Sequence, residues 1–398
     1  MDKPIIFYGA GSSAKEVLEQ CFSKNIVPVC FTDSDKRKHN SSFEAVGGSF
    51  EILPLNDALE RWPDADVLIS TNPVWYAEVR ELLLSNGLSE ERVRFPDSLK
   101  FFVGIPKHCP EIGHFFVLDG LGYKTCCGPY IRNCASTGNL EEDIAQYYEF
   151  CEQLRDALNE GKLTSCADCS MLRDGRSEEP LKIERVNLST GLPGGDRCNA
   201  RCCYCTYGES LGAHAREDNL LEIVRKLTAQ PDMDYLYYAS GELSISPYRD
   251  EILKMWKEKG WAGQIDTNAF LYCDGITTLL RDRRVRAEIS LDAGTPETFT
   301  KVKGVDCLGR VMRNIKRYAE AGEVWLKYII LEGINDNDTD IDGFVTIAKK
   351  MYVRHIVISR DRRVMYAPMT DNESSAFARL VNQCQTARLP YSFSNGEI

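Results

Sequence analysis

Residues 182–398 alternate apolar runs with amphipathic stretches, and this alternation limits the folds open to the chain. Stretches such as "REDNLLEIVRKLTAQ" predict helices between the apolar runs, which predict strands. Strands and helices that alternate in this way form parallel sheets covered by helices. The segment therefore predicts a partial (β/α)6 barrel, with its functional residues at the carboxyl ends of the strands. The predicted strands span residues 183–189, 234–239, 264–269, 286–291, 324–331 and 354–359.

Residues 1–100 show the same alternation and predict a separate Rossmann-like parallel-sheet domain. "FYGAGSSAKEV" places Gly9, Gly11 and Ala14 between a strand and a helix, where backbone N–H groups can approach a pyrophosphate. The next strand ends in "FTDSD", which places Asp33 to bind a ribose hydroxyl. The layout resembles the N-terminal domains of sugar-modifying acyltransferases, and this resemblance implies a nucleotide-sugar ligand. The alternative is a domain retained for docking, without a ligand.

Four cysteines lie within eight residues after the first predicted strand of the barrel, in "GGDRCNARCCYCTYGES". Cys198, Cys202 and Cys205 form C-x3-C-x2-C, and three thiolates this close can hold three irons of a 4Fe–4S cube. One iron then remains open. Cys203 is out of this register, and we expect it to pack beneath the loop. The alternative is a zinc site that combines this segment with a C-x2-C pair further upstream.

The spacing C-x3-C-x-Φ-C, with Tyr204 as the aromatic residue, resembles the motif of radical S-adenosylmethionine (radical SAM) enzymes. The resemblance implies that the open iron binds S-adenosylmethionine, which is cleaved reductively to a 5′-deoxyadenosyl radical that abstracts hydrogen from a substrate. It also implies a low-potential electron donor such as flavodoxin or ferredoxin. The cofactor supplies the difficult chemistry, and the protein positions it and excludes water.

Two further segments are similar to those of the radical SAM family. Ser240, Gly241 and Glu242 in "YYASGELSISP" stand where the family has a Gly-Gly-Glu turn that receives the methionine amino group. "EISLDAGTPE" is similar to the family's Ser-Leu-Asp segment, which implies Ser290 and Asp292 as contacts to the cofactor. Turn and helix-cap roles are the alternative, because these residue types favour both.

Residues 101–181 are rich in cysteine and contain one predicted helix, "NLEEDIAQYYEFCEQLRDALNEG". The segment resembles the SPASM and twitch elaborations of radical SAM enzymes, although those normally follow the barrel. The resemblance implies one auxiliary 4Fe–4S cluster, with free thiols or a zinc site as the alternative. We expect Cys109 to be a core thiol instead. The implied cluster ligands are Cys127, Cys134, Cys166 and Cys169, with Cys126 as a substitute.

The net charge and the composition of the chain indicate which kinds of binding partner and which cellular compartment to expect. A net charge of −11 argues against a nucleic-acid surface, and no apolar run is long enough to span a membrane. Sixteen cysteines without a secretion signal predict a cytoplasmic protein.

The predicted function is a radical SAM oxidoreductase or epimerase acting on a small metabolite, such as a carbohydrate or nucleotide-linked sugar. An epimerase needs a hydrogen donor, and Cys273, which follows the third predicted strand, is our candidate. Two alternatives remain open. They are radical modification of a ribosomally made peptide and a non-catalytic iron–sulfur or zinc protein.

Overall fold

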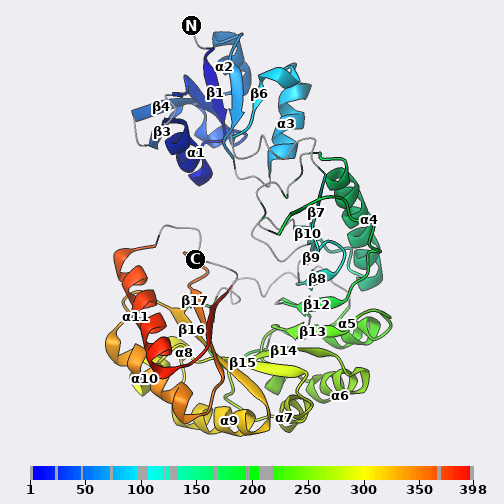
Figure 1. Ribbon diagram of the computed structural model, residues 1–398, viewed down its shortest axis with the longest axis vertical. Helices are drawn as coiled ribbons and strands as arrows, with labels where there is room; N and C mark the ends of the chain where they lie inside the picture. Colours follow the sequence, from blue (N-terminus) through cyan, green and yellow to red (C-terminus); the bar gives the residue numbers. More distant parts are fainter. Residues whose placement is uncertain are drawn as a thin grey trace. The chain divides into compact units, whose positions relative to one another are not determined.

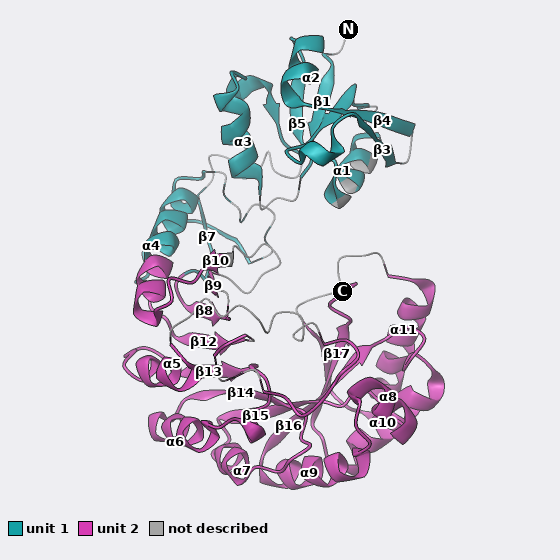
Figure 2. Cartoon of the chain, turned by 180° about the vertical axis from the view of Figure 1, so that it is seen from behind, with its two compact units in different colours: residues 1–112, 128–132, 149–181 teal, residues 113–127, 133–148, 182–398 magenta. Residues whose placement is uncertain are grey.

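The chain forms an α/β structure with parallel sheets, as the sequence predicts. The chain folds into two compact units, which we call unit 1 and unit 2 (Figure 2). Unit 1 comprises residues 1–112, 128–132 and 149–181, and unit 2 comprises residues 113–127, 133–148 and 182–398. The computed structural model describes residues 3–22, 26–45, 48–71, 75–96, 106–120, 122–125, 133–162, 164, 166, 169, 171–189, 191–193, 195, 197–205, 218–364 and 369–394.

Unit 1 contains a six-stranded sheet in the order β3-β4-β2-β1-β5-β6, parallel except for the β3–β4 hairpin (Figure 1). Helix α1 packs on one face, and α2 and α3 pack on the other. Because β2 and β5 flank β1, the chain changes direction there, which is where ligands bind in sheets of this kind. The strands are β1 (Ile5–Tyr8), β2 (Cys30–Thr32), β3 (Ser41–Ala45), β4 (Gly48–Leu53), β5 (Asp66–Ile69) and β6 (Val93–Arg94). The helices are α1 (Ser12–Phe22), α2 (Leu55–Arg61), α3 (Tyr76–Ser85) and the short 3₁₀ turns η1 (Lys36–Lys38) and η3 (Glu90–Arg92).

Unit 1 also contains a short antiparallel pair outside this sheet. Strand β7 (Lys107–His108) pairs with β11 (Arg173–Asp174), with His108 opposite Arg173. The pair brings together two segments that are 65 to 67 residues apart in the sequence, and cysteines lie close to both segments in the sequence.

Unit 2 contains a ten-stranded sheet in the order β10-β9-β8-β12-β13-β14-β15-β16-β17-β18. Each of the six strands predicted in the barrel overlaps one of β12–β17. Strands β8, β9 and β10 were not predicted, because they are short, lie in the cysteine-rich segment and lack a clear period. Strand β8 pairs in parallel with β12, and so extends the barrel sheet. The strands are β8 (Phe115–Leu118), β9 (Gly122–Lys124), β10 (Asn133–Ala135), β12 (Arg185–Leu188), β13 (Tyr235–Tyr238), β14 (Ala262–Thr267), β15 (Val285–Ser290), β16 (Glu323–Ile330), β17 (His355–Arg360) and β18 (Tyr391–Phe393).

The sheet of unit 2 is curved, and helices cover its outer face (Figure 1). Along β13 and β16, side chains on the outer face are buried and those on the inner face are mostly half-buried. This alternation follows from the two-residue period of a strand. The helices are α5 (Leu220–Leu227), α6 (Arg249–Lys259), α7 (Asp274–Arg281), α8 (Pro296–Lys303), α9 (Leu308–Ala321), α10 (Asp338–Lys350), α11 (Asp371–Ala387) and the 3₁₀ turn η6 (Leu243–Ile245).

Helix α4 (Leu140–Asn159) is the helix predicted in the cysteine-rich segment, and the boundary between the two units falls within it. Its Tyr147 hydroxyl donates to the carbonyl oxygen of Phe115 in β8, at 2.9 Å. None of the helices in the described part of the chain combines the length and apolar character that a membrane span requires.

The turn after β1 requires glycine at one of its two glycine positions. Gly9 has φ of 111°, and a Cβ there would lie 2.4 Å from Cγ2 of Thr71. At Gly11 a Cβ would have no atom within 4 Å. We expect Gly9→Ala to lower the free energy of unfolding by about 1–3 kcal/mol, because it combines backbone strain with a steric clash.

Gly11→Ala is the matched control and should change the free energy of unfolding by less than about 0.5 kcal/mol. Urea unfolding of both variants measures the difference. Equal stabilities of the two variants would contradict this account of the turn.

Candidate cofactor site

The three predicted cluster ligands lie on one loop, residues 197–205, which follows β12. All three are free thiols, and Cys198 and Cys205 are exposed. The N–H of Cys205 donates to the carbonyl oxygen of Cys202 at 3.0 Å, which closes a tight turn between these two ligands. The N–H of Ala200 donates to Sγ of Cys198 at 3.5 Å. Three accessible thiols on a structured loop are a suitable donor set for an iron–sulfur cluster.

Cys203 does not pack beneath the loop, so our expectation for this residue was wrong. It is exposed, and its backbone makes two hydrogen bonds to other parts of the chain. Its N–H donates to the carbonyl oxygen of Val302 at 2.9 Å, and its own carbonyl oxygen accepts from Nη1 of Arg363 at 3.0 Å. These two hydrogen bonds hold the backbone of Cys203, and its side chain remains exposed.

The cysteine loop is bound to the C-terminal end of α8. The carbonyl oxygens of Val302 and Lys303 accept hydrogen bonds from the N–H groups of Cys203 and Arg201, both at 2.9 Å. The last carbonyl groups of a helix have no partner within the helix, so the loop satisfies them. Gly304 ends the helix with φ of 70°, and a Cβ there would lie 2.9 Å from Cβ of Arg201. Glycine at this position therefore permits the close approach.

A buried ion pair lies beneath the same loop. Nζ of Lys303 donates to Oδ2 of Asp292 at 2.5 Å and to the hydroxyl of Tyr204 at 2.7 Å. Tyr204 in turn donates to Oδ2 of Asp292 at 2.6 Å. Oδ1 of Asp292 accepts from the N–H of Ile329 in β16 at 2.7 Å. Lys303 is 1% exposed and Asp292 is fully buried.

Asp292 therefore has a different role from the predicted cofactor contact. Both of its carboxylate oxygens are bound to protein donors, and it joins the cysteine loop, α8 and the end of β16. Its φ is 55°, an unusual value for a residue other than glycine, and the side-chain amide of Asn335 donates to its carbonyl oxygen. These contacts make Asp292 a positioning residue.

The charges around the loop act on its thiols. Burial raises the pKa of the Cys202 thiol, whereas the Lys303 ammonium acts to lower it and Asp292 acts to raise it. Burial also raises the pKa of Cys198, against the hydrogen bond from Ala200. A metal ligand must be the thiolate, so the nearby Lys303 cation favours the form of Cys202 that binds metal.

Glu242 connects the cysteine loop to the end of β14. Its carboxylate accepts hydrogen bonds from the N–H of Ser244 at 3.0 Å, the hydroxyl of Thr267 at 2.9 Å and the N–H of Asn268 at 2.7 Å. Its own N–H donates to the carbonyl oxygen of Arg197 on the cysteine loop. The residue is 1% exposed, and this set of donors holds its carboxylate in one orientation.

Asn268 was not among the predicted site residues, yet it lies between Glu242 and the cysteines. Its side-chain amide donates to Oδ1 of Asn199 at 2.6 Å and approaches Sγ of Cys198 at 3.7 Å. The sequence signal was present, because the third predicted strand ends in "DTNAF" and places an amide at a carboxyl end. The amide of Asn268 thus approaches the predicted cluster ligand Cys198 from the end of β14.

The other predicted cofactor contacts differ in exposure. Ser290 is half-buried at the carboxyl end of β15. Ser240 is fully buried, and its hydroxyl has no hydrogen-bond partner among the described residues. A Cβ at Gly195 would lie 2.7 Å from Oγ of Ser240, so Ser240 lies beneath the turn and not at its surface. Gly241 has φ of 54°, which fits a tight turn before Glu242.

A polar network occupies the inner face of the sheet. Asp266 accepts hydrogen bonds from the Tyr237 hydroxyl and the Gln264 amide, both at 2.8 Å. The same amide donates to Glu288, whose carboxylate lies 3.6 Å from Nζ of Lys327. Burial, and then the charge of Glu288, raise the pKa of Asp266 to about 7. The face therefore presents groups that can bind a polar substrate.

Cys273 lies at the start of α7 and is 6% exposed. Its N–H donates to the hydroxyl of Tyr318 at 2.8 Å. Its surroundings are those of a core thiol, and the structure gives no sign of an exposed hydrogen donor at this position.

The predicted auxiliary ligands fall into three groups. Cys126 and Cys127 lie outside the described residues. Cys134 lies in β10 of unit 2, and Cys166 and Cys169 lie in unit 1. The predicted set is thus drawn from both units.

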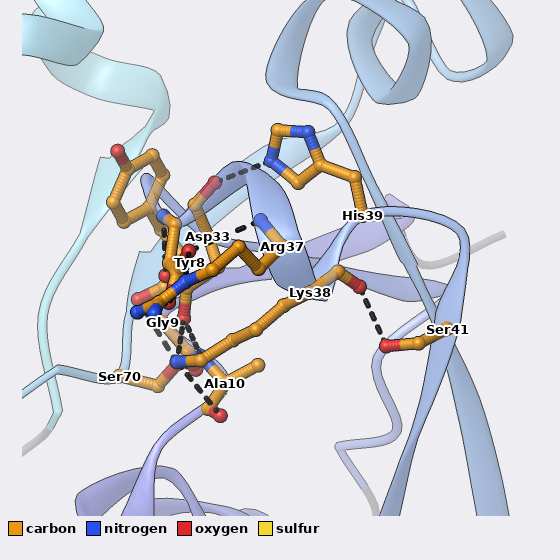
Figure 3. Close-up of polar contacts among 10 residues, drawn as sticks. Tyr8, Gly9, Ala10, Asp33, Arg37, Lys38, His39, Ser41 and Ser70 are labelled. Atoms are coloured by element: carbon orange, nitrogen blue, oxygen red, sulfur yellow. Dashed lines mark hydrogen bonds and ion pairs between the residues drawn. The ribbon is translucent and has the colours of Figure 1, made fainter.

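In unit 1, Asp33 lies at the end of β2, beside the glycine turn (Figure 3). Its Oδ2 accepts from the N–H of Ala10 and from Nζ of Lys38, both at 2.8 Å, and its Oδ1 accepts from the N–H of Asp35. Burial acts to raise the pKa of Asp33, but these partners outweigh it and hold the pKa below its ordinary value. The carboxylate of Asp33, which was predicted to bind a ribose hydroxyl, thus stabilises the glycine turn through its hydrogen bond from Ala10. Ala14 is fully buried between α1 and the sheet.

The loop with three free thiols lies at the carboxyl end of a parallel strand, an arrangement that suits a thiolate-ligated metal site. Residues 192–345 match the model of the Radical SAM superfamily, and they form a radical SAM domain, which confirms that prediction. A radical SAM domain implies a 4Fe–4S cluster and S-adenosylmethionine.

Curated relatives match part of the chain. GTP 3′,8-cyclase of Clostridium botulinum is 27% identical over 164 residues, 39% of this chain and 50% of the relative. Probable GTP 3′,8-cyclase of Saccharolobus islandicus is 28% identical over 188 residues, 46% of this chain and 57% of the relative. The chain spans about half the length of these relatives.

Solved structures are also similar to part of the chain. Streptococcus suis SuiB bound to S-adenosylmethionine is 13% identical with a TM-score of 0.41, over 72% of this chain and 71% of that one. A radical SAM methyltransferase from Sphaerobacter thermophilus is 15% identical with a TM-score of 0.39, over 50% and 63% of the two chains.

The buried ion pair generates a prediction for stability. We expect Lys303→Met to lower the free energy of unfolding by about 3–5 kcal/mol, because it leaves the Asp292 carboxylate buried without its cation. Denaturant unfolding of the chain measures the change. Lys301→Met is the matched control, since Lys301 lies exposed on the same helix. A loss no larger than that of the control would show that the pair does not hold the loop.

The raised pKa of Asp266 generates a prediction for pH. Between about pH 4 and pH 7 the folded state keeps a proton that the unfolded state has released, so this residue's contribution to stability falls as pH rises. Asp266→Asn removes the effect, and the stability of the variant relative to the wild type should rise over this window. Thermal unfolding at several pH values measures it. Asp342→Asn, at an exposed position in α10, should show no such trend.

Proposed function

We propose that the chain is an enzyme that reductively cleaves S-adenosylmethionine and abstracts hydrogen from a small metabolite. The observation that carries this proposal is the cysteine loop, with three free thiols beside the Glu242 and Asn268 side chains at adjacent strand ends. When bound, the cluster and S-adenosylmethionine would supply the 5′-deoxyadenosyl radical that abstracts hydrogen. A flavodoxin or ferredoxin would supply the electron.

The chain's own residues bind and orient the cofactor in this proposal. Cys198, Cys202 and Cys205 would hold the cluster. The Glu242 carboxylate, oriented by its neighbours, would accept the methionine ammonium, since opposite charges form the stronger hydrogen bonds. Ser290 would donate to the carboxylate or ribose of the cofactor from the end of β15.

The substrate class that we favour is a nucleotide-linked sugar, undergoing oxidation or epimerisation. Two observations support it. The inner face of the sheet carries carboxylate, amide, hydroxyl and ammonium groups, which suit a hydroxyl-rich ligand. The matched relatives are named for GTP, itself a nucleotide. They are named for a cyclisation, so oxidation or epimerisation is our own proposal and does not come from them.

Unit 1 would bind a nucleotide-sugar by itself, at the turn between β1 and α1. The turn between β1 and α1 leaves open space at Gly11, and Lys38 places its ammonium 3.4 Å from the carbonyl oxygen of Ala10 on the same turn. A cation beside a helix N-terminus is a suitable partner for a diphosphate.

The cluster assignment predicts that three of the four cysteines of the loop are required for cleavage of S-adenosylmethionine and that the fourth is not. We expect Cys198→Ala, Cys202→Ala and Cys205→Ala each to abolish formation of 5′-deoxyadenosine from S-adenosylmethionine. Cys203→Ala should keep it, because the exposed Cys203 thiol is outside the ligand spacing. Chromatography after anaerobic reconstitution and dithionite reduction measures the product. Loss of cleavage in Cys203→Ala alone would overturn the assignment.

The nucleotide-sugar proposal predicts that Gly11→Ala weakens binding without weakening the fold. A methyl group at this position meets no protein atom, so it obstructs only a bound ligand. Calorimetric titration of the full chain with UDP-glucose measures the affinity, and Gly309→Ala in α9 is a control distant in sequence. Equal affinities of wild type and Gly11→Ala would exclude the turn as the binding site.

A further inference from the structure

Two arginines lie on the cysteine loop, residues 197–205. Arg197 and Arg201 are exposed, and the loop contains no acidic residue, although the chain as a whole has a net charge of −11. Within the part of the chain that the structure describes, neither side chain forms a hydrogen bond or an ion pair. Other exposed arginines do, for example Arg225 with Glu251. The loop therefore presents two cations that no described carboxylate neutralises.

A third arginine reaches the loop from the segment that follows β17. Nη1 of Arg363 donates to the carbonyl oxygen of Cys203 at 3.0 Å, and its Nε donates to Oδ2 of Asp361 at 2.9 Å. The side chain of Arg363 is 47% exposed, whereas that of Asp361 is 10% exposed. The cation is therefore the more accessible partner of this ion pair. Val364, the next residue, is also exposed, and interfaces between proteins combine arginine with apolar side chains.

The acidic residues around the loop are less accessible than these arginines. In the described part of the chain, the acidic residues that hydrogen-bond to the loop or to Arg363 are buried, namely Glu242, Asp292 and Asp361. Asp306, just after α8, is exposed, and it balances at most one of the three arginines. A protein that approaches the loop therefore meets net positive charge on a chain that is acidic as a whole.

Arg201 and Arg363 are held next to the predicted cluster ligand Cys202. Arg201 precedes this cysteine in the sequence, and Cys203, which follows it, accepts the hydrogen bond from Arg363. A protein that contacts both arginines therefore comes within a few residues of a predicted ligand. Electron transfer between two proteins requires their redox centres to lie close together, and such complexes need only a small interface.

We propose that Arg197, Arg201 and Arg363 form the docking surface for an acidic electron-transfer protein. The inference rests on the proposed function, because reductive cleavage needs an electron. One electron leaves the reduced partner, which is thereby oxidised, and is used to break the C5′–S bond of S-adenosylmethionine. The products are methionine and the 5′-deoxyadenosyl radical. Complementary charge accelerates such an encounter and discriminates against partners of the wrong charge.

The test compares two sources of electrons for the full chain after anaerobic reconstitution. One source is dithionite at saturating concentration, a small reductant that needs no docking surface. The other is an acidic flavodoxin at subsaturating concentration, kept reduced by its reductase and NADPH. Chromatography measures the rate at which 5′-deoxyadenosine forms with each source.

Arg201→Glu is the test variant, because only the backbone of Arg201 hydrogen-bonds to α8. We expect the flavodoxin-driven rate to fall about tenfold or more, since reversal of the charge opposes steering, and the dithionite-driven rate to stay unchanged. Arg201→Lys keeps the charge and should retain both rates. Lys259→Glu should also retain both, because this exposed residue ends α6 and precedes β14, at the amino end of the strands.

The dependence on salt gives an independent check. The flavodoxin-driven rate of the wild type should fall as NaCl rises from about 0.05 to 0.5 M, because salt screens exposed charges. The fall should be smaller in Arg201→Glu. A flavodoxin-driven rate that is insensitive both to salt and to Arg201→Glu would overturn the docking surface.

The two sources of electrons separate failure of this inference from failure of the proposed function. A wild type that forms no 5′-deoxyadenosine with dithionite would overturn both. A wild type that accepts electrons from dithionite but not from flavodoxin would overturn the docking surface alone. Equal losses with both sources in Arg201→Glu would assign the arginine to binding of S-adenosylmethionine or substrate, and would also overturn the docking surface.

A binding measurement tests the surface without turnover. Surface plasmon resonance measures the affinity of oxidised flavodoxin for the immobilised chain. We expect Arg197→Glu and Arg201→Glu each to weaken binding about tenfold, with Arg201→Lys and Lys259→Glu close to the wild type. Equal affinities of the wild type and Arg201→Glu would exclude this surface as the docking site.

Discussion

The ion pair between Lys303 and Asp292 supports the arrangement of the whole candidate site. A charge buried without a partner costs several kcal/mol, so neither residue would remain in place alone. The desolvation cost of this buried pair is offset in part because the Asp292 carboxylate also accepts hydrogen bonds from the Tyr204 hydroxyl and the N–H of Ile329. The cysteine loop, the end of α8 and the end of β16 are therefore positioned by one carboxylate.

Much of this structure can be read from the sequence, because hydrophobic periodicity determines which segments form strands and helices. All six strands predicted within residues 182–398 overlap strands of the structure. The strands β8–β10 were missed because each is only three or four residues long, and a segment of that length shows too few side chains to reveal a period. Their place in the sheet depends on pairing with β12, a contact that no local pattern encodes.

The sequence indicated which residues lie near the candidate sites, but it did not indicate what each of their side chains contacts. Asp33 and Asp292 both follow strand ends, as a ligand-binding carboxylate would, yet each is bound to protein donors. A local sequence cannot show this, because the partners Lys38, Lys303 and Ile329 come from other elements. Cys203 illustrates the same limit. Its backbone docks on α8, so its exposed side chain follows from a contact about one hundred residues away.

Amino-acid substitutions on the two faces of the curved sheet should affect the stability of the fold differently. Along β13 and β16 the outer side chains are packed against helices, so a substitution there leaves a void or a clash. The inner side chains, such as Tyr237 and Lys327, meet polar neighbours and retain some access to solvent. Substitutions on the inner face can therefore change which polar groups it presents while the packing of the outer face against the helices is retained.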